Sequence, residues 1–94
     1  MAPVWDEAKR AANFRKHGVD FADVDGFGWE SADIETDQRR DYGETRYLAT
    51  GMIGDRLHVL VFTVRDEDVR LISLRKANGR EVRRYEKKHK RTSG

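Results

Sequence analysis

The 94-residue sequence contains no cysteine and no long apolar run. Without cysteine the chain has neither disulfides nor thiolate metal ligands, which fits a reducing compartment. No apolar run approaches the roughly 18 residues of a membrane span, and the N-terminus lacks the basic and apolar regions of a secretory signal. We therefore expect a cytoplasmic protein with no membrane segment. Because only 37% of the residues are hydrophobic, we expect one domain over residues 1–94 with a modest core.

Recognisable metal-binding and nucleotide-binding motifs are also missing. The three histidines, His17, His58 and His89, lie on separate predicted elements, and no two have the helical spacing of a metal-binding pair. The sequence has neither a phosphate-binding glycine-rich loop nor a nucleophile elbow. We therefore expect no metal and no cofactor.

Charged residues, in contrast, are abundant and unevenly distributed. The net charge is only +2, but fifteen acidic residues stand against nine basic ones up to Val69, and ten basic against two acidic from Arg70 onward. Opposite charges at the two ends suit a polyanion at one end and a basic partner at the other. Ordinary solvated surface charge is the alternative interpretation.

Hydrophobic periodicity predicts an α+β fold. A first helix is expected from the capping residue Asp6 to Gly18, which suits a left-handed C-terminal cap, and Ala8, Ala11 and Ala12 share one of its faces. Asn78 and Glu81 form a capping box that begins a last helix reaching about residue 89. Period-two patterns predict strands at 46–53, 57–64 and 69–74, with weaker edge-strand signals at 3–5 and around Ile34. We expect an antiparallel sheet of about four strands packed against an N-terminal and a C-terminal helix.

The run 57–64 is apolar on both faces, so it is predicted to be the central strand. The two residues Gly54 and Asp55 suit a hairpin turn before it. Residues 21–25 suit a short helical turn, and Phe27 and Trp29 are predicted to contact the core or a partner. A basic tail is expected from about residue 88, with residues 92–94 frayed.

Guanidinium and ammonium groups gather where the predicted strands end. Arg65 follows the central strand, Arg70 lies on the returning strand, and Arg75 and Lys76 end it just before a helix N-terminus, which attracts phosphate. Several such groups can stabilise the charge of a phosphoryl transfer. A ribonuclease that uses no metal needs these groups and residues that take and give protons. The residues of suitable type for proton transfer are His17, Glu44, Lys76, Glu81 and Tyr85.

A cationic stripe is predicted along the last helix, and its members are Arg80, Arg84, Lys87, Lys88 and Arg91. Arg70, on the strand before, is predicted to be a further nucleic-acid contact. Such a stripe attracts a nucleic-acid backbone in a salt-dependent way and needs no active site. Structural interpretations stay open for the candidates. Arg70 and Arg75 can pair with Glu44 or with the acidic turn at 66–68, His17 suits a helix C-terminus, and Tyr85 suits the core.

Several short motifs, taken in order, resemble the BrnT family of bacterial type II toxins. They lie between about Val4 and Tyr85 and read WDEAK at 5–9, KHGV at 16–19, DYGE at 41–44, TVR at 63–65 and ISLRKA at 72–77. Each motif alone is weak, but their combination and order are specific. The sequence departs from the family pattern at Leu74, where a small residue is usual, and residues 26–37 match little.

The resemblance implies a RelE-like fold and a metal-independent endoribonuclease that cleaves RNA by attack of the 2′-hydroxyl and stops translation. It implies a BrnA-like antitoxin that dimerises through a ribbon-helix-helix domain, binds two toxins, and represses the operon at its operator DNA. Arg65, Arg75 and Lys76 are then candidates for phosphate binding. His17 and Glu44 are candidates for proton transfer, and Glu81 and Tyr85 for positioning substrate. A non-catalytic nucleic-acid-binding corepressor is the alternative function.

Overall fold

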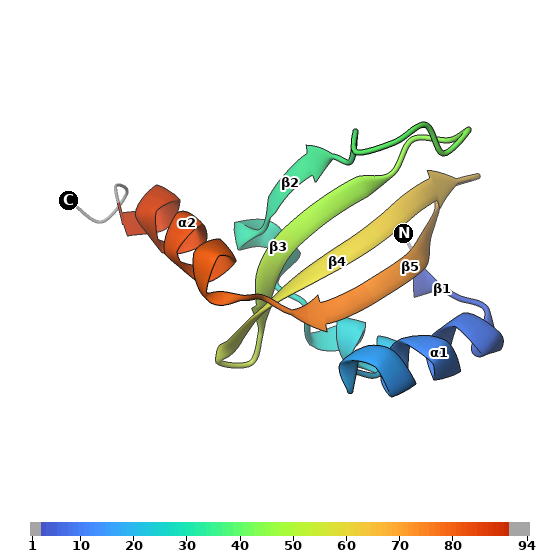
Figure 1. The fold of residues 1–94 in the computed structure, drawn as a ribbon, viewed down its shortest axis with the longest axis horizontal. Helices are drawn as coiled ribbons and strands as arrows, with labels where there is room; N and C mark the ends of the chain where they lie inside the picture. Colours follow the sequence, from blue (N-terminus) through green and yellow to red (C-terminus); the bar gives the residue numbers. More distant parts are fainter. Residues whose placement is uncertain (1–2, 91–94) are drawn as a thin grey trace.

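Residues 3–90, the part of the chain described by the computed structural model, are built around one five-stranded sheet (Figure 1). The strand order is β1-β5-β4-β3-β2. The strands are β1 (Pro3–Val4), β2 (Asp33–Thr36), β3 (Tyr47–Ile53), β4 (Arg56–Arg65) and β5 (Asp68–Lys76). Neighbours from β2 to β5 run antiparallel, whereas β1 pairs with β5 in parallel. The α+β class is confirmed, and the sheet differs from the prediction by a fifth, parallel edge strand.

The central position predicted for the most apolar run is confirmed in β4. Every residue from Leu57 to Thr63 is buried, because β3 and β5 cover both edges of this strand and other elements cover much of its faces. The turn before β4 consists of Gly54 and Asp55, and Gly54 has a φ of 61°, which glycine adopts without steric cost.

The two faces of the sheet are covered unequally. The inner face carries Leu60, Leu71 and Leu74 and is covered by the short 3-10 helices η1 (Phe21–Gly26) and η2 (Trp29–Ser31), which lie behind the sheet in Figure 1. The opposite face, which we call the open face, is covered at one end by α2 (Gly79–Lys90). Val82 and Tyr85 of α2 pack there against a small cluster of Leu57, Val59 and Ala77, as expected for this helix.

Helix α1 (Glu7–His17) lies along the β5 edge of the sheet and is attached by polar contacts. As predicted, the Asp6 side chain accepts a hydrogen bond from the Ala8 amide at 2.7 Å, and Gly18 is left-handed with a φ of 70°. The three alanines that share a face are exposed, and the one buried residue of α1 is Asn13. The attachment of this helix therefore depends on a polar side chain.

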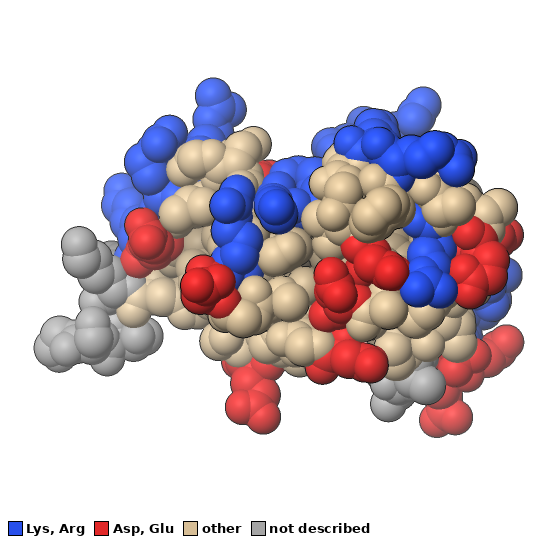
Figure 2. Space-filling model, turned by 90° about the horizontal axis from the view of Figure 1, so that it is seen from below, with Lys and Arg blue, Asp and Glu red and all other residues tan. Residues whose placement is uncertain are grey.

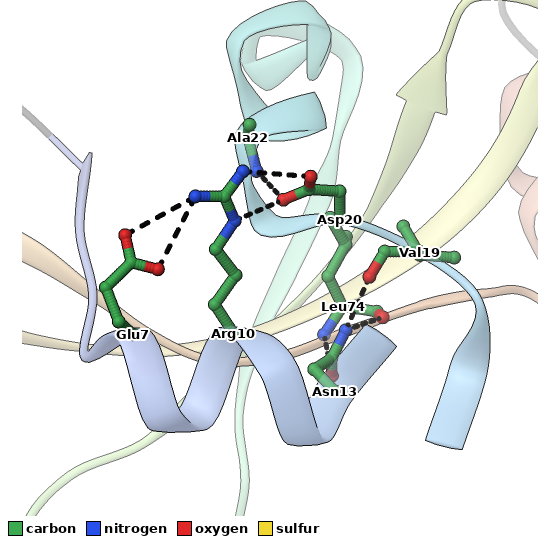
Figure 3. Close-up of polar contacts among 7 residues, drawn as sticks. All are labelled: Glu7, Arg10, Asn13, Val19, Asp20, Ala22 and Leu74. Atoms are coloured by element: carbon green, nitrogen blue, oxygen red, sulfur yellow. Dashed lines mark hydrogen bonds and ion pairs between the residues drawn. The ribbon is translucent and has the colours of Figure 1, made fainter. Parts of the chain in front are cut away.

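The Asn13 amide bridges α1 and the edge of β5 (Figure 3). Its nitrogen donates to the carbonyls of Val19 at 3.0 Å and Leu74 at 2.8 Å, and its oxygen accepts from the Leu74 amide at 3.1 Å. In the same view, Arg10 donates two hydrogen bonds to Asp20, at 2.7 and 3.0 Å, and lowers the pKa of that carboxyl to about 2. Together these contacts fix α1 and the loop that follows it.

Two predictions about the C-terminus lie outside the described residues, namely the place of Arg91 on the cationic stripe and the fraying of residues 92–94. The structure likewise leaves the end of the predicted basic tail undescribed. Within residues 3–90 no helix is long and apolar enough to cross a membrane.

Candidate nucleic-acid interface and active site

The register of β4 and β5 brings three arginines onto the open face. Paired residues of antiparallel strands share a face. Arg75 pairs with Val59 and Arg70 pairs with Thr63, and alternation along β4 places both partners and Arg65 on one side. Arg46 stands two residues before Leu48 of β3, which pairs with Val61, so alternation places Arg46 on the same face as well. We call the set of Arg46, Arg65, Arg70 and Arg75 the arginine row.

A β-bulge makes this arrangement possible. Arg70 and Arg75 are five positions apart on β5, and in a regular strand an odd separation places side chains on opposite faces. The pairing register shifts between Val61 and Phe62, where the partners on β5 step from Ser73 to Leu71. The extra residue, Ile72, reverses the alternation, so the side chains of Arg70 and Arg75 point to the same side.

Arg75 and Glu81 form the best-aligned charged contact of this face. The two terminal nitrogens of Arg75 each donate to one Glu81 oxygen at 2.8 Å, which is the parallel fork geometry of a strong ion pair. These hydrogen bonds raise the pKa of Arg75, against smaller opposing effects of desolvation and the charge of Arg39. The same bonds lower the pKa of Glu81. Both groups are therefore charged at neutral pH, and Glu81 is a weak base.

Glu81 also confirms the predicted capping box. One of its oxygens accepts from the Asn78 amide at 2.9 Å, and the Asn78 side chain accepts from the Glu81 amide at 2.9 Å. The first turn of α2 and the Arg75 side chain are thus held by one carboxylate.

Glu44 links the other end of the arginine row. It accepts from Arg65 at 3.4 Å and from Arg46 at 3.3 Å, and its side chain is 30% exposed. The Arg46 guanidinium lies over the Tyr42 ring, 4.0 Å from its centroid. The arginines of this end are therefore positioned by a carboxylate and by an aromatic ring.

The loop between β2 and β3 is anchored through the buried carboxylate of Asp37. Arg39 donates to its two oxygens at 2.8 Å each, and the Tyr42 hydroxyl donates at 3.0 Å. The hydrogen bonds from Arg39 hold the pKa of Asp37 well below its usual range. The charge of Arg39 slightly lowers the pKa of Arg75, so the two guanidinium groups lie within electrostatic range of each other.

His17 lies beside β5 at the end of α1. It lines a pocket with Asn13, Ile72 and Ser73, close to the bulge. Burial lowers the pKa of His17, and the charges of Lys16 and Arg75 lower it further. His17 is therefore neutral at neutral pH and able to accept a proton.

Lys76 and Tyr85 are placed differently from the other candidates. Lys76 pairs with His58, so its side chain lies on the face opposite to Arg75, and it has no ion pair within residues 3–90. The Tyr85 hydroxyl donates to the Ser31 carbonyl at 3.0 Å, and its ring stacks on His89 at 4.0 Å. These contacts favour the structural interpretation of Tyr85 as the residue that ties α2 to η2.

The cationic stripe on α2 is partly neutralised by β2. Arg84 lies 3.5 Å from Glu35, and Lys88 lies 4.0 Å from Asp33. Arg80, Lys87 and Arg70 have no ion pair with any described residue. Figure 2 shows basic side chains gathered along the upper edge of the molecule, whereas acidic side chains lie across its middle and lower part.

Sequence reasoning missed Arg46 as a member of the arginine row and Arg39 as the residue that anchors the loop after β2. Alternation could have placed Arg46, which stands two residues before the partly buried Leu48. No local pattern marks Arg39, whose position depends on the fold of its loop. The three histidines lie apart, and no group of three His, Asp or Glu residues in the described part of the chain is arranged to hold a metal.

A family model described as "ribonuclease toxin, BrnT, of type II toxin-antitoxin system" matches residues 5–81, which is most of the chain. The chain belongs to the BrnT toxin family. It is therefore the toxin of a type II toxin–antitoxin system, its family is one of ribonucleases, and its partner is an antitoxin. A search of curated proteins gave no match.

Proposed function

We propose that this toxin is a metal-independent endoribonuclease whose active site is the open face between α2 and the loop of residues 37–46. The observation that supports the proposal is the arginine row, which the bulge turns to one side of the sheet. A single RNA strand lying along this row would meet successive guanidinium groups, which bind phosphate in a bidentate manner. The expected reaction is attack of a 2′-hydroxyl on the adjacent phosphate.

In this proposal Arg75 stabilises the charge that develops on the phosphate. Its side chain is 31% exposed and is held by Glu81, so it is ordered before substrate binds. Donors that are positioned in advance need little reorganisation during the reaction, which is the main source of electrostatic catalysis. Arg70 and Arg65 bind neighbouring phosphates.

Proton transfer is assigned to His17 and Glu44. A histidine with a lowered pKa is unprotonated at neutral pH, which suits a general base for the 2′-hydroxyl. Glu44 lies between Arg65 and Arg46 at the other end of the row. The low pKa of Glu81 makes a positioning role more suitable for that residue.

Family membership supports a proposal for the biological role. We propose that RNA cleavage in the cytoplasm inhibits translation until a BrnA-like ribbon-helix-helix antitoxin binds the toxin. Because such an antitoxin is a symmetric dimer, two toxins and two antitoxins are expected in the complex, which then represses the operon at its operator DNA.

The test is incubation of purified, antitoxin-free toxin with end-labelled RNA in EDTA. Arg75→Ala is expected to slow cleavage by about 100-fold or more, the usual effect of removing one transition-state donor. Arg70→Ala, which removes a contact to a neighbouring phosphate, is expected to weaken RNA binding. Lys76→Ala removes the same charge next to Arg75 but from the opposite face, and we expect cleavage within about threefold of the parent. Thermal unfolding of each variant shows whether the fold is retained. Equal loss in Arg75→Ala and Lys76→Ala would contradict the assigned face.

A non-catalytic corepressor is the second candidate. The charges of Arg70, Arg80 and Lys87, which have no ion pair with a described residue, favour it. They suit salt-dependent binding to a nucleic-acid backbone without cleavage. The two functions differ in turnover. If excess RNA shifts on a gel and stays intact, also in the presence of translating ribosomes, the corepressor is correct.

A further inference from the structure

Large apolar side chains are exposed at one end of the inner face. In the described chain four such side chains are more than a third exposed, and three of them, Ile34 at 50%, Val64 at 44% and Trp29 at 38%, belong to this end. Ile34 pairs with the buried Ala49, and Val64 with the buried Val69, so these side chains continue the core surface beyond the area that η1 and η2 cover.

These residues surround a groove, which we call the apolar groove. Five elements contribute to its lining, which consists of Pro3, Trp29, Ile34, Phe62 and Val69. Aromatic contacts keep its shape, because Phe62 meets the Trp29 ring edge to face at 5.4 Å and stacks on Tyr47 at 5.4 Å. An exposed apolar surface with polar surroundings is typical of a protein interaction site.

The surroundings of the groove are acidic. Glu30, next to the lining residue Trp29, is exposed and has no ion pair within the described residues. The turn before Val69 adds Asp66 and Glu67.

We propose that the apolar groove is the docking surface for a basic amphipathic segment of the antitoxin. The apolar lining would take the hydrophobic side of the segment, and the carboxylates of Glu30, Asp66 and Glu67 would pair with its Lys and Arg residues. The acidic surroundings repel RNA and anionic lipid, so charge complementarity favours a basic protein segment. The identity of the partner rests on the proposed function, whereas the surface is argued from its own residues.

Docking here is separable from cleavage, because the groove and the arginine row lie on opposite faces of the sheet. Substitutions in the groove are therefore expected to change antitoxin binding and to leave RNA cleavage intact.

The experiment is calorimetric titration of the purified toxin with its cognate antitoxin. Ile34→Asp places a charge in the groove beside other carboxylates, and we expect affinity to fall by at least about tenfold. Phe14→Asp is the matched control. Phe14 on α1 is 56% exposed and lies outside the groove, and its substitution by Asp introduces the same charge as Ile34→Asp. Glu30→Lys is expected to weaken binding severalfold and to reduce its dependence on salt.

Each outcome distinguishes the proposal from its alternatives. Affinity that is unchanged in Ile34→Asp and Val64→Asp, with both variants folded, overturns it, and so does a loss confined to Phe14→Asp. A second copy occupies the groove instead if the toxin alone forms a dimer that Ile34→Asp dissociates. Failure of the proposed function has a different signature, because RNA then stays intact with every variant while the binding differences persist.

Discussion

Replacement of Asn13 by alanine is expected to destabilise the fold far more than its position on an exposed helix suggests. The change removes three hydrogen bonds. The Asn13 side chain donates two of them, to the carbonyls of Val19 and Leu74, and accepts the third from the Leu74 amide. Leu74 is fully buried, so its backbone groups lose a partner that water does not readily replace. Each buried group left without a partner costs about 1–3 kcal/mol.

For three such groups we expect a loss of about 3–5 kcal/mol, since some water enters the space of the missing amide. The whole free energy of unfolding of a chain this size is about 5–14 kcal/mol. The midpoint of thermal unfolding should therefore fall by about 15–30 °C. Urea denaturation followed by circular dichroism measures the loss directly.

Two further variants test the cause. Lys16→Ala, an exposed change on the same helix, should alter stability by less than about 0.5 kcal/mol. Asn13→Asp keeps the acceptor but aims a buried charge at two carbonyls, so it should be worse than alanine at neutral pH and recover in acid, where the protonated carboxyl donates. A loss below about 1 kcal/mol in Asn13→Ala would refute the reasoning, because the bridge to β5 would then be dispensable.

Two other predictions concern the β4–β5 turn and His17. Asp66 and Glu67 have positive φ angles of 52° and 73°, which are unfavourable for non-glycine residues. Glu67→Gly should stabilise the fold by about 0.5–1 kcal/mol in urea denaturation, whereas Glu67→Ala, which keeps the strain, should give no gain. Because the pKa of His17 is lowered, cleavage should persist below the ordinary histidine range and fall only in more acidic solution. In His17→Gln this acid limb of the pH profile should disappear, and an unchanged profile would exclude His17 as the base.

Local patterns predicted most of the secondary structure. The capping box at Asn78, the caps of α1 and the apolar run of β4 depend on neighbouring residues alone, so the sequence contains the information needed. The two edge strands gave only weak signals, because a strand of two or four residues has too few positions for a clear period.

The site was harder to predict because it depends on register. Arg75 and Lys76 are adjacent in sequence and were expected to act together, but adjacent strand residues face opposite sides of a sheet. Arg70 and Arg75 share a face only because of the bulge at Ile72, and no residue type in this segment predicts a bulge. The partners of the charged groups also needed the fold, since Arg75 pairs with Glu81 and Glu44 pairs with Arg65.

The shared carboxylate of Glu81 has a mechanical consequence. Its Oε1 atom accepts hydrogen bonds from both Arg75 and the Asn78 amide. A phosphate that draws Arg75 toward itself changes the geometry at an atom that also closes the first turn of α2. Phosphate binding at Arg75 and formation of the first turn of α2 are therefore thermodynamically coupled. A change that stabilises the turn alters the phosphate affinity of Arg75, and bound phosphate alters the equilibrium constant for forming the turn by the same factor.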